Sequence, residues 1–149
     1  MNHSSPQLTR CRVHHVKKRG LWPLFGGRVT ATECAIWEVD GQGVEVSDGA
    51  ELFLKSSKLQ KNKLNGIWVR NAGSLTVDDC DITDNVYSGV AVVVGKLQAV
   101  NCRLTGNGAA GVWAENGSEG SVEGCTLTNN SRGASFLDRG AKVKVVRSG

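Results

Sequence analysis

Short runs in which apolar and polar residues alternate recur along the whole chain, separated by residues that favour turns. In one stretch the apolar residues occupy every second position of 75–77, 80–82 and 90–92. Alternation with a period of two is typical of strands that bury one face, whereas a helix repeats its apolar positions every three or four residues. The pattern therefore predicts short β-strands in these ranges and at equivalent places elsewhere.

These runs belong to a motif of about thirteen residues that occurs six times. Its lead positions are Cys11, Cys34, Ser57, Cys80, Cys102 and Cys125, and its glycines are Gly20, Gly43, Gly66, Gly89, Gly111 and Gly133. Each step in both series is 22 or 23 residues. A fixed period of this size indicates a solenoid, in which each repeat buries its apolar face against its neighbours.

Three short strands in each repeat predict an all-β fold, a parallel β-helix of about six and a half rungs formed by residues 1–149 as one domain. Two aliphatic columns of its core stand two places after the lead position and directly after the glycine. They are Val13, Ile36, Leu59, Ile82, Leu104 and Leu127, and Leu21, Val44, Ile67, Val90, Val112 and Ala134. The segment 141–149 matches the start of a further rung.

Asparagines stand five places after four of the lead positions, at Asn62, Asn85, Asn107 and Asn130. Asn tolerates the left-handed conformation of turns, and stacked amides can hydrogen-bond from rung to rung. The glycine column serves a turn that needs positive φ or a close backbone approach. We interpret both columns as structural.

The pattern C-x-[ILV]-x-x-N, followed by a glycine and an alternating V-x-V, resembles the right-handed β-helix repeats of the pectate-lyase-like superfamily from about Leu8 to Val146. It is also similar to the Asn- and Gly-rich repeats of F-box adaptors, SHC-binding spindle proteins and periplasmic copper-maturation proteins. The resemblance implies a right-handed coil. It leaves activity open, because the superfamily includes lyases, hydrolases and epimerases as well as non-catalytic binding modules.

Several classes of function are disfavoured by composition. No stretch has the roughly 18 consecutive apolar residues of a membrane span, and the first residues lack the apolar segment of a secretory signal, which favours a cytoplasmic protein. A net charge of +4, with a basic segment at 10–19, is too small to indicate nucleic acid. Neither end carries a polar cap, so we expect a piece of a longer β-helix or ends covered by another copy or a partner.

The five cysteines follow the repeat period and lack metal-ligand spacing. Stacked rungs could bring them within disulfide range, but the odd number and the missing signal favour free, buried thiols. The acidic segment 78–84 could hold Ca²⁺. Alignment instead places Asp78 beside Lys55, and Asp81 between Lys58 and Arg103. We therefore prefer a charge ladder, and we predict no metal and no cofactor.

Candidate catalytic residues are few. His14 and His15 are adjacent on a predicted strand, so they should point to opposite faces and cannot act on one substrate. Lys58, Asp81 and Arg103 have the chemistry that a lyase needs, but the charge ladder explains them as well. We predict no catalytic residue.

The outward face of the third strand differs from the other two, which are polar. Three of the four tryptophans fall in one of its columns, about 10 Å apart on alternate rungs. The two outward columns read Trp22, Glu45, Trp68, Ala91, Trp113 and Ser135, and Leu24, Ser47, Arg70, Val93, Glu115 and Leu137. An aromatic and aliphatic stripe of this kind usually marks an interaction surface.

We therefore predict a non-catalytic binding or scaffold module that binds a protein partner or a second copy of itself. The predicted site comprises Trp22, Trp68, Arg70, Val93, Trp113, Glu115 and Leu137. The alternative is a carbohydrate-binding or carbohydrate-active β-helix, because the same spacing suits sugar rings; its polar groups would be Glu45, Arg70 and Glu115. A third interpretation is that a flanking segment covers the stripe as ordinary core.

Overall fold

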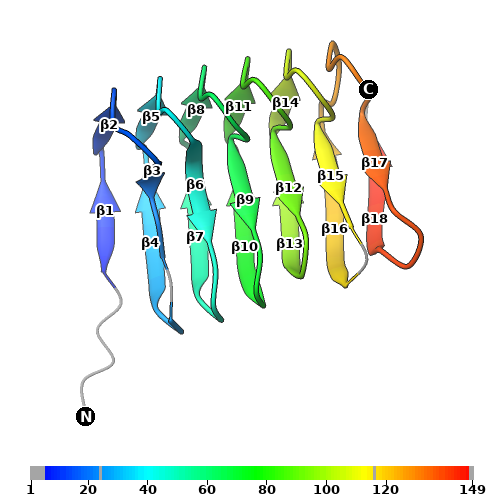
Figure 1. Ribbon diagram of the computed structural model, residues 1–149, viewed down its shortest axis with the longest axis horizontal. Coiled ribbons are helices and arrows are strands. Elements are labelled where there is room, and N and C mark those ends of the chain that lie inside the picture. The colour runs from blue at the N-terminus through cyan, green and yellow to red at the C-terminus, as the bar shows by residue number, and fades with distance from the viewer. Residues whose placement is uncertain (1–5, 24, 116, 148–149) are drawn as a thin grey trace.

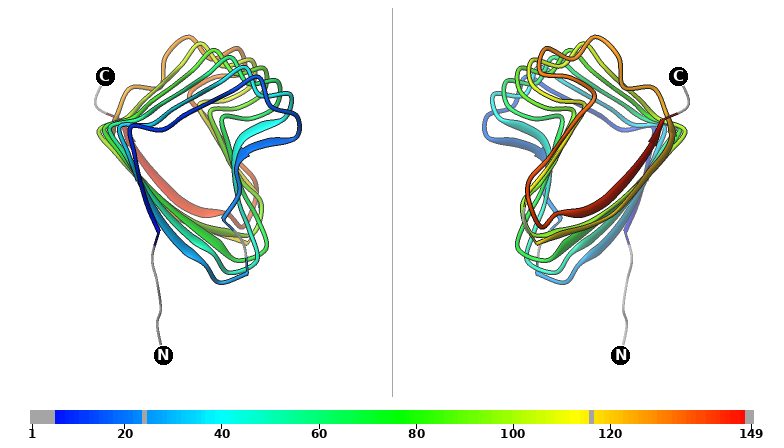
Figure 2. Two further views of the ribbon diagram at one scale, coloured as in Figure 1. Left: turned by 90° about the vertical axis from the view of Figure 1, so that its left-hand side faces the viewer. Right: turned by 90° about the vertical axis from the view of Figure 1, so that its right-hand side faces the viewer.

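A computed structural model describes residues 6–23, 25–115 and 117–147. Its strands follow one another around a coil whose rungs stack along one axis, with the amino-terminal rung at one end and the carboxyl-terminal rung at the other (Figure 1). Views along the axis show three flat faces joined by turns (Figure 2). The predicted parallel β-helix is therefore confirmed. Leu24, assigned above to an outward column, lies outside the described residues.

Every strand belongs to one of three sheets, in which all pairs are parallel. The first sheet contains β1 (Gln7–Thr9), β4 (Arg28–Thr32), β7 (Glu51–Lys55), β10 (Gly73–Asp78), β13 (Gly95–Val100), β16 (Ser118–Cys125) and β18 (Lys142–Arg147). The second contains β2 (Arg12–His14), β5 (Ala35–Trp37), β8 (Lys58–Gln60), β11 (Asp81–Thr83) and β14 (Arg103–Thr105). The third contains β3 (Arg19–Leu21), β6 (Gln42–Val46), β9 (Ile67–Val69), β12 (Val90–Val92), β15 (Val112–Ala114) and β17 (Ser135–Leu137).

The core lies inside the coil and consists of the predicted aliphatic columns, except that Ser135, not Ala134, pairs with Val112 in the last rung. Ile36, Leu59, Ile82 and Leu104 are stacked in register and are almost fully buried. Each sheet contributes its inward residues to this interior, while the residues between them face outward. Among the described residues, no helix is long and apolar enough to cross a membrane.

The asparagine column forms a continuous buried ladder at the turn after the second sheet. The side-chain amide of Asn62 donates to Oδ1 of Asn85 at 2.9 Å, Asn85 donates to Asn107 at 3.0 Å, and Asn107 donates to Asn130 at 3.0 Å. Each Oδ1 also accepts the backbone N–H of the preceding asparagine. The predicted rung-to-rung bonding is confirmed.

The expectation that these asparagines adopt the left-handed conformation was wrong. Positive φ occurs one residue earlier, at Lys61 (57°), Asp84 (56°), Gly106 (71°) and Asn129 (59°). The corner is turned by that residue, which leaves the asparagine side chain directed inward to bond with the neighbouring rungs. Asn is therefore selected at this position for its hydrogen bonds.

The glycine column allows the backbone and side chains of the next rung to approach closely. A Cβ added at Gly66 would lie 2.6 Å from Ile82 Cγ2 and 2.7 Å from the carbonyl oxygen of Gly89. Similar contacts face Gly43, Gly89 and Gly111. Only glycine leaves room for the turn and the asparagine ladder to lie against each other.

The last rung is shifted by one residue relative to the prediction. The register pairs Trp113 with Phe136 and Ala114 with Leu137. This rung has one residue fewer between its asparagine and its glycine, so Ala134 takes the place that Gly111 holds one rung earlier. Leu137 therefore does not belong to the outward column to which it was assigned, and Phe136 continues the tryptophan column in place of Ser135.

Candidate functional site

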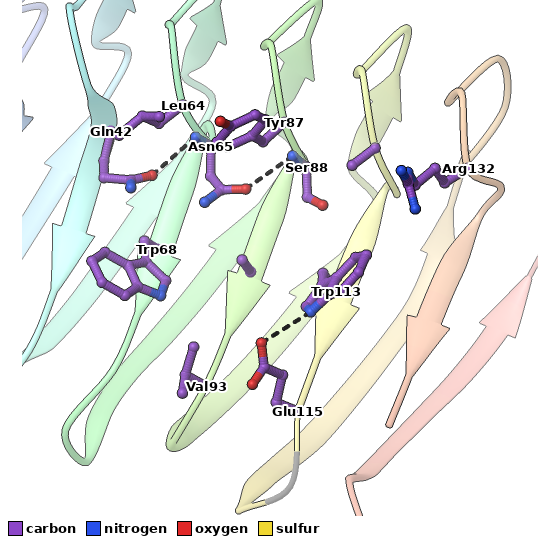
Figure 3. A pocket seen from close by; sticks show the side chains of 12 residues that line it. Gln42, Leu64, Asn65, Trp68, Tyr87, Ser88, Val93, Trp113, Glu115 and Arg132 are labelled. Atoms are coloured by element: carbon purple, nitrogen blue, oxygen red, sulfur yellow. Dashed lines mark hydrogen bonds between the residues drawn. The ribbon is translucent and has the colours of Figure 1, made fainter. Parts of the chain in front are cut away.

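A groove with a volume of about 540 Å³ lies on the outer surface of the third sheet, where β9, β12 and β15 meet the turns that precede them (Figure 3). Its lining residues come from successive rungs, so its long direction runs parallel to the axis of the coil. The lining residues are Gln42, Leu64, Asn65, Trp68, Tyr87, Ser88, Ala91, Val93, Ala109, Trp113, Glu115 and Arg132.

The floor of the groove consists of Trp68, Ala91 and Trp113, which are paired in register on three successive strands. Because neighbouring strands lie about 4.8 Å apart, the two indole rings are about 10 Å apart along the axis. Both indoles are half-buried, and Ala91 leaves space between them. Nε1 of Trp113 donates to Glu115 at 3.2 Å, and the ring of Phe136 stacks on Trp113 with centroids 4.1 Å apart.

One wall of the groove is formed by polar residues that each directly precede a glycine of the repeat in the sequence. Gln42 Oε1 accepts the backbone N–H of Asn65, whose Oδ1 accepts that of Ser88, both at 2.9 Å. The Ser88 hydroxyl accepts the N–H of Ala110 at 3.2 Å. Among the described residues, the amide nitrogens of Gln42 and Asn65 donate to no protein acceptor, and none of the buried polar atoms lacks a partner, so these nitrogens reach solvent in the groove.

The upper rim is formed by Tyr87 and Arg132, which lie on the turns between the second and third sheets. The Tyr87 side chain is 52% exposed. Figure 3 shows the Arg132 guanidinium directed back toward the groove. The groove therefore combines an aromatic floor with hydrogen-bond donors along one side.

Four of the seven predicted site residues meet in this groove, namely Trp68, Val93, Trp113 and Glu115. Trp22 lies apart from it, two rungs before Trp68, where its Nε1 donates to Ser47 at 2.9 Å. Leu137 was assigned on the wrong register, as described above.

Arg70, the remaining predicted site residue, is bound to a buried carboxylate. Its Nε donates to Glu45 at 2.8 Å, and its guanidinium lies 5.1 Å from the Trp68 ring centroid. Glu45 is 1% exposed and also accepts from Arg19 at 2.7 Å, while Arg19 lies 3.8 Å from the Trp22 ring. Glu45 was predicted to face outward as a polar group for sugars. It does occupy the outward column, paired with Trp68, but the ion pairs with both arginines bury it, so it is not available to a sugar.

Five lining residues were not predicted from the sequence, namely Gln42, Asn65, Ser88, Tyr87 and Arg132. A signal for the wall was present, since the position before the first five glycines reads Arg19, Gln42, Asn65, Ser88 and Ala110. Tyr87 and Arg132 gave no such signal, because their placement depends on the conformation of the turns.

The two histidines contradict the prediction that they point to opposite faces. Nδ1 of His14 and Nδ1 of His15 are 2.7 Å apart, and His14 stacks on Trp37 with centroids 4.3 Å apart. His15 has left the strand and adopts a φ of 55°, which turns its ring back toward its neighbour. Its Nε2 contacts Glu38. The histidine pair therefore lies at the second sheet, whereas the groove lies on the third sheet.

The acidic segment forms ion pairs centred on Arg103. Arg103 binds Asp81, as the charge ladder predicted, and also Asp79 at 3.0 Å. The hydrogen bond that Arg103 donates to Asp81 is the largest cause that raises the pKa of Arg103 above its usual value. Asp78 is paired with Lys55 in the register. Within the described ranges, no three His, Cys, Asp or Glu side chains are placed to hold a metal ion.

All five cysteines are free thiols, as predicted. Burial raises the pKa of Cys34, and a hydrogen bond with Cys102, followed by burial, raises the pKa of Cys125. Both effects keep these thiols protonated near neutral pH and reduce their nucleophilicity. Cys34, Cys80, Cys102 and Cys125 are buried, so the column is part of the core.

Comparison with known proteins agrees with the fold. A sequence profile described as a right-handed beta helix region matches residues 1–148. A sequence search finds no significant match among curated proteins. The solved structure of the periplasmic alginate epimerase AlgG is similar with a TM-score of 0.72 at 12% identity, over 95% of this chain and 39% of AlgG.

A second similar structure is the A-module of the mannuronan C-5 epimerase AlgE6 from Azotobacter vinelandii. It gives a TM-score of 0.51 at 19% identity, over 96% of this chain and 58% of that one. The chain therefore spans less than two thirds of either neighbour. At these identities the similarity shows a shared fold, and the predicted resemblance to right-handed β-helix repeats is confirmed.

Proposed function

Because the chain belongs to the right-handed β-helix family and carries an aromatic groove along its rungs, we propose that it is a non-catalytic binding module for an extended carbohydrate chain. The observation that carries this proposal is the pairing of Trp68 and Trp113, two rungs apart, with the free amide donors of Gln42 and Asn65. A sugar chain lying along the axis would meet both.

The chemistry of the groove suits sugars on two sides. Sugar rings have an apolar face of C–H groups that packs on an aromatic ring, and a periphery of hydroxyls that needs hydrogen-bond partners. The indoles supply the first contact, and the amides and the Ser88 hydroxyl supply the second. Of the polar groups predicted for sugars, Glu115 lines the groove, whereas Glu45 and Arg70 are bound to each other and do not line it. AlgG and AlgE6, which share the fold, are named as epimerases of alginate and mannuronan, both of which are carbohydrates.

Hydrolysis is disfavoured by the titratable groups in the groove. Among the described lining residues, Glu115 is the one carboxylate, and it accepts a hydrogen bond from Trp113. Hydrolysis of a glycosidic bond generally uses two carboxylates on opposite sides of the bond. The groove therefore supports binding better than hydrolysis.

A protein partner or a second copy of the chain is the second candidate, and it is favoured by the apolar surface beside the groove. Phe136 is 40% exposed and Leu137 is 41% exposed, and Phe136 stacks directly on Trp113. Exposed aromatic and aliphatic groups that adjoin one another are typical of protein interfaces. This candidate uses the same tryptophan but leaves the polar wall without a role.

The test is titration calorimetry with a panel of hexasaccharides, comprising mannohexaose, xylohexaose, maltohexaose and the hexamers of mannuronate and galacturonate. We expect at least one member to bind, and we expect Trp68→Ala and Trp113→Ala each to weaken that binding by about 2 kcal/mol, or roughly thirtyfold. The reason is that each substitution removes one of the two stacking surfaces.

Trp37→Ala is the matched control, because Trp37 lies on the second sheet and stacks on His14. It should leave the affinity unchanged. If no hexasaccharide binds, or if all three variants bind equally well, carbohydrate binding in this groove is wrong. Sedimentation of the same samples then examines the second candidate, since self-association through Phe136 would raise the mass above the 15.8 kDa of one chain.

A further inference from the structure

We propose that the groove selects a neutral, extended, 1,4-linked glycan, one sugar per rung, in preference to a chain of uronic acids. This inference rests on the function proposed above and specifies the class of ligand. It is carried by two observations, the alternation of large and small residues on the floor and the distribution of charge along the two sides.

The floor repeats along the axis at the strand spacing of about 4.8 Å. A sugar in an extended 1,4-linked chain advances by nearly this distance, so one sugar can lie over each rung. When both linkage bonds are equatorial, successive sugars are turned over about the chain axis, and every second sugar presents the same face. Trp68 and Trp113 would stack on the first and third sugars, while Ala91 leaves room for the middle one.

The wall carries no charge on the rungs that the tryptophans span. The wall positions on these three rungs are Asn65, Ser88 and Ala110, and Gln42 stands one rung earlier, so the wall offers amide and hydroxyl donors and no base. A polyuronate carries one carboxylate on each sugar and would therefore need a base on each rung. A column of neutral donors matches hydroxyl groups and leaves such carboxylates without counterions.

The opposite side of the floor is equally unsuited to repeated negative charge. Its column reads Arg70, Val93 and Glu115 on successive rungs. Arg70 does not line the groove, because it is bound to the buried Glu45, which it shares with Arg19; Glu115 is an anion in the lining. The lining contains one further charge, Arg132, so its two charges cancel. Repulsion from Glu115 would oppose a carboxylate on the sugar above Trp113.

The sharpest comparison uses mannohexaose and the hexamer of mannuronate, because the two chains have the same β-1,4 linkage and differ only in a hydroxymethyl group replaced by a carboxylate. We expect mannohexaose to bind about tenfold more tightly, a difference of about 1.4 kcal/mol, at low ionic strength. Maltohexaose, whose linkage coils the chain, should bind more weakly than mannohexaose, since it cannot place its first and third sugars over the two indoles.

Glu115→Gln tests the charge argument. It should reduce the ratio of the two affinities several-fold, because the glutamine can still accept from Trp113 but does not repel a carboxylate. Glu119→Gln, an equal change of charge on the exposed face of β16, should leave the ratio unchanged. Tighter binding of the mannuronate hexamer, or equal binding of maltohexaose, would overturn this inference while leaving the proposed function intact. If no hexasaccharide binds, the proposed function fails as well.

Discussion

Replacement of Asn85 with alanine is expected to lower the free energy of unfolding by about 3 kcal/mol. Asn85 is 2% exposed, and its Oδ1 accepts two hydrogen bonds from Asn62, one from the backbone and one from the side chain. Its amide nitrogen donates to Asn107 and to the carbonyl of Leu59. Alanine would leave two buried donors of Asn62 without acceptors, and each unsatisfied donor costs about 1–3 kcal/mol. Urea denaturation followed by circular dichroism measures the change.

Gln98→Ala is the control for this variant, since Gln98 is exposed on the outward face of β13 one rung further along. Its effect should stay within about 0.5 kcal/mol. Equal stability of the Asn85→Ala and Gln98→Ala proteins would show that the ladder adds nothing to the fold.

The second large effect is expected for Gly66→Ala, which should destabilise the protein by about 3 kcal/mol. The new methyl group would lie 2.6 Å from Ile82 Cγ2, 2.7 Å from the Gly89 carbonyl oxygen and 2.9 Å from Asn85 Nδ2. These distances are far below van der Waals contact, so the rungs must separate locally and the asparagine ladder must stretch. Thermal and urea unfolding of the variant measure the loss.

Gly26→Ala separates this steric effect from the ordinary cost of replacing a glycine. A Cβ at Gly26 would meet nothing within 4 Å, but its φ of 71° is unfavourable for alanine. We expect a loss of only about 1 kcal/mol there. If Gly26→Ala proves as damaging as Gly66→Ala, close approach is not the reason for the glycine column.

The architecture could be predicted from the sequence because every rung repeats the same physical requirements. Burial of stacked aliphatic residues such as Ile82 and Leu104, bonding between asparagines and close approach at glycines each leave a residue type at a fixed spacing. A solenoid also lacks contacts between distant repeats, so the period alone specifies which residues are neighbours. For this reason the strand register was correct over most of the chain.

The errors arose where a turn departs from the repeat. The last rung is one residue shorter between asparagine and glycine, and alignment on Gly133 therefore exchanged the positions of Ser135 and Phe136. The predicted direction of the His15 side chain was wrong because this residue forms a corner with positive φ and is not part of the strand. A shortened turn and a left-handed residue change side-chain direction without changing the hydrophobic pattern.

The candidate site was predicted only in part, because some of its residues lie on turns and not on strands. The column of Trp68 and Trp113 follows from strand alternation, whereas the rim formed by Tyr87 and Arg132 follows from turn geometry. Burial of Glu45 between two arginines could not be predicted from strand alternation either, because an outward position on a strand usually faces solvent. The surface that looked like an aromatic stripe is in fact a groove with one aromatic and one polar side.

The most direct test of the groove as a carbohydrate site is nuclear magnetic resonance of the four indole N–H signals during titration with mannohexaose. Trp68 and Trp113 lie on the floor of the groove, while Trp22 bonds to Ser47 outside it and Trp37 stacks on the second sheet. We predict that the signals of Trp68 and Trp113 shift together and saturate, while those of Trp22 and Trp37 stay in place. Four unchanged signals, or shifts confined to Trp22 and Trp37, would contradict the account.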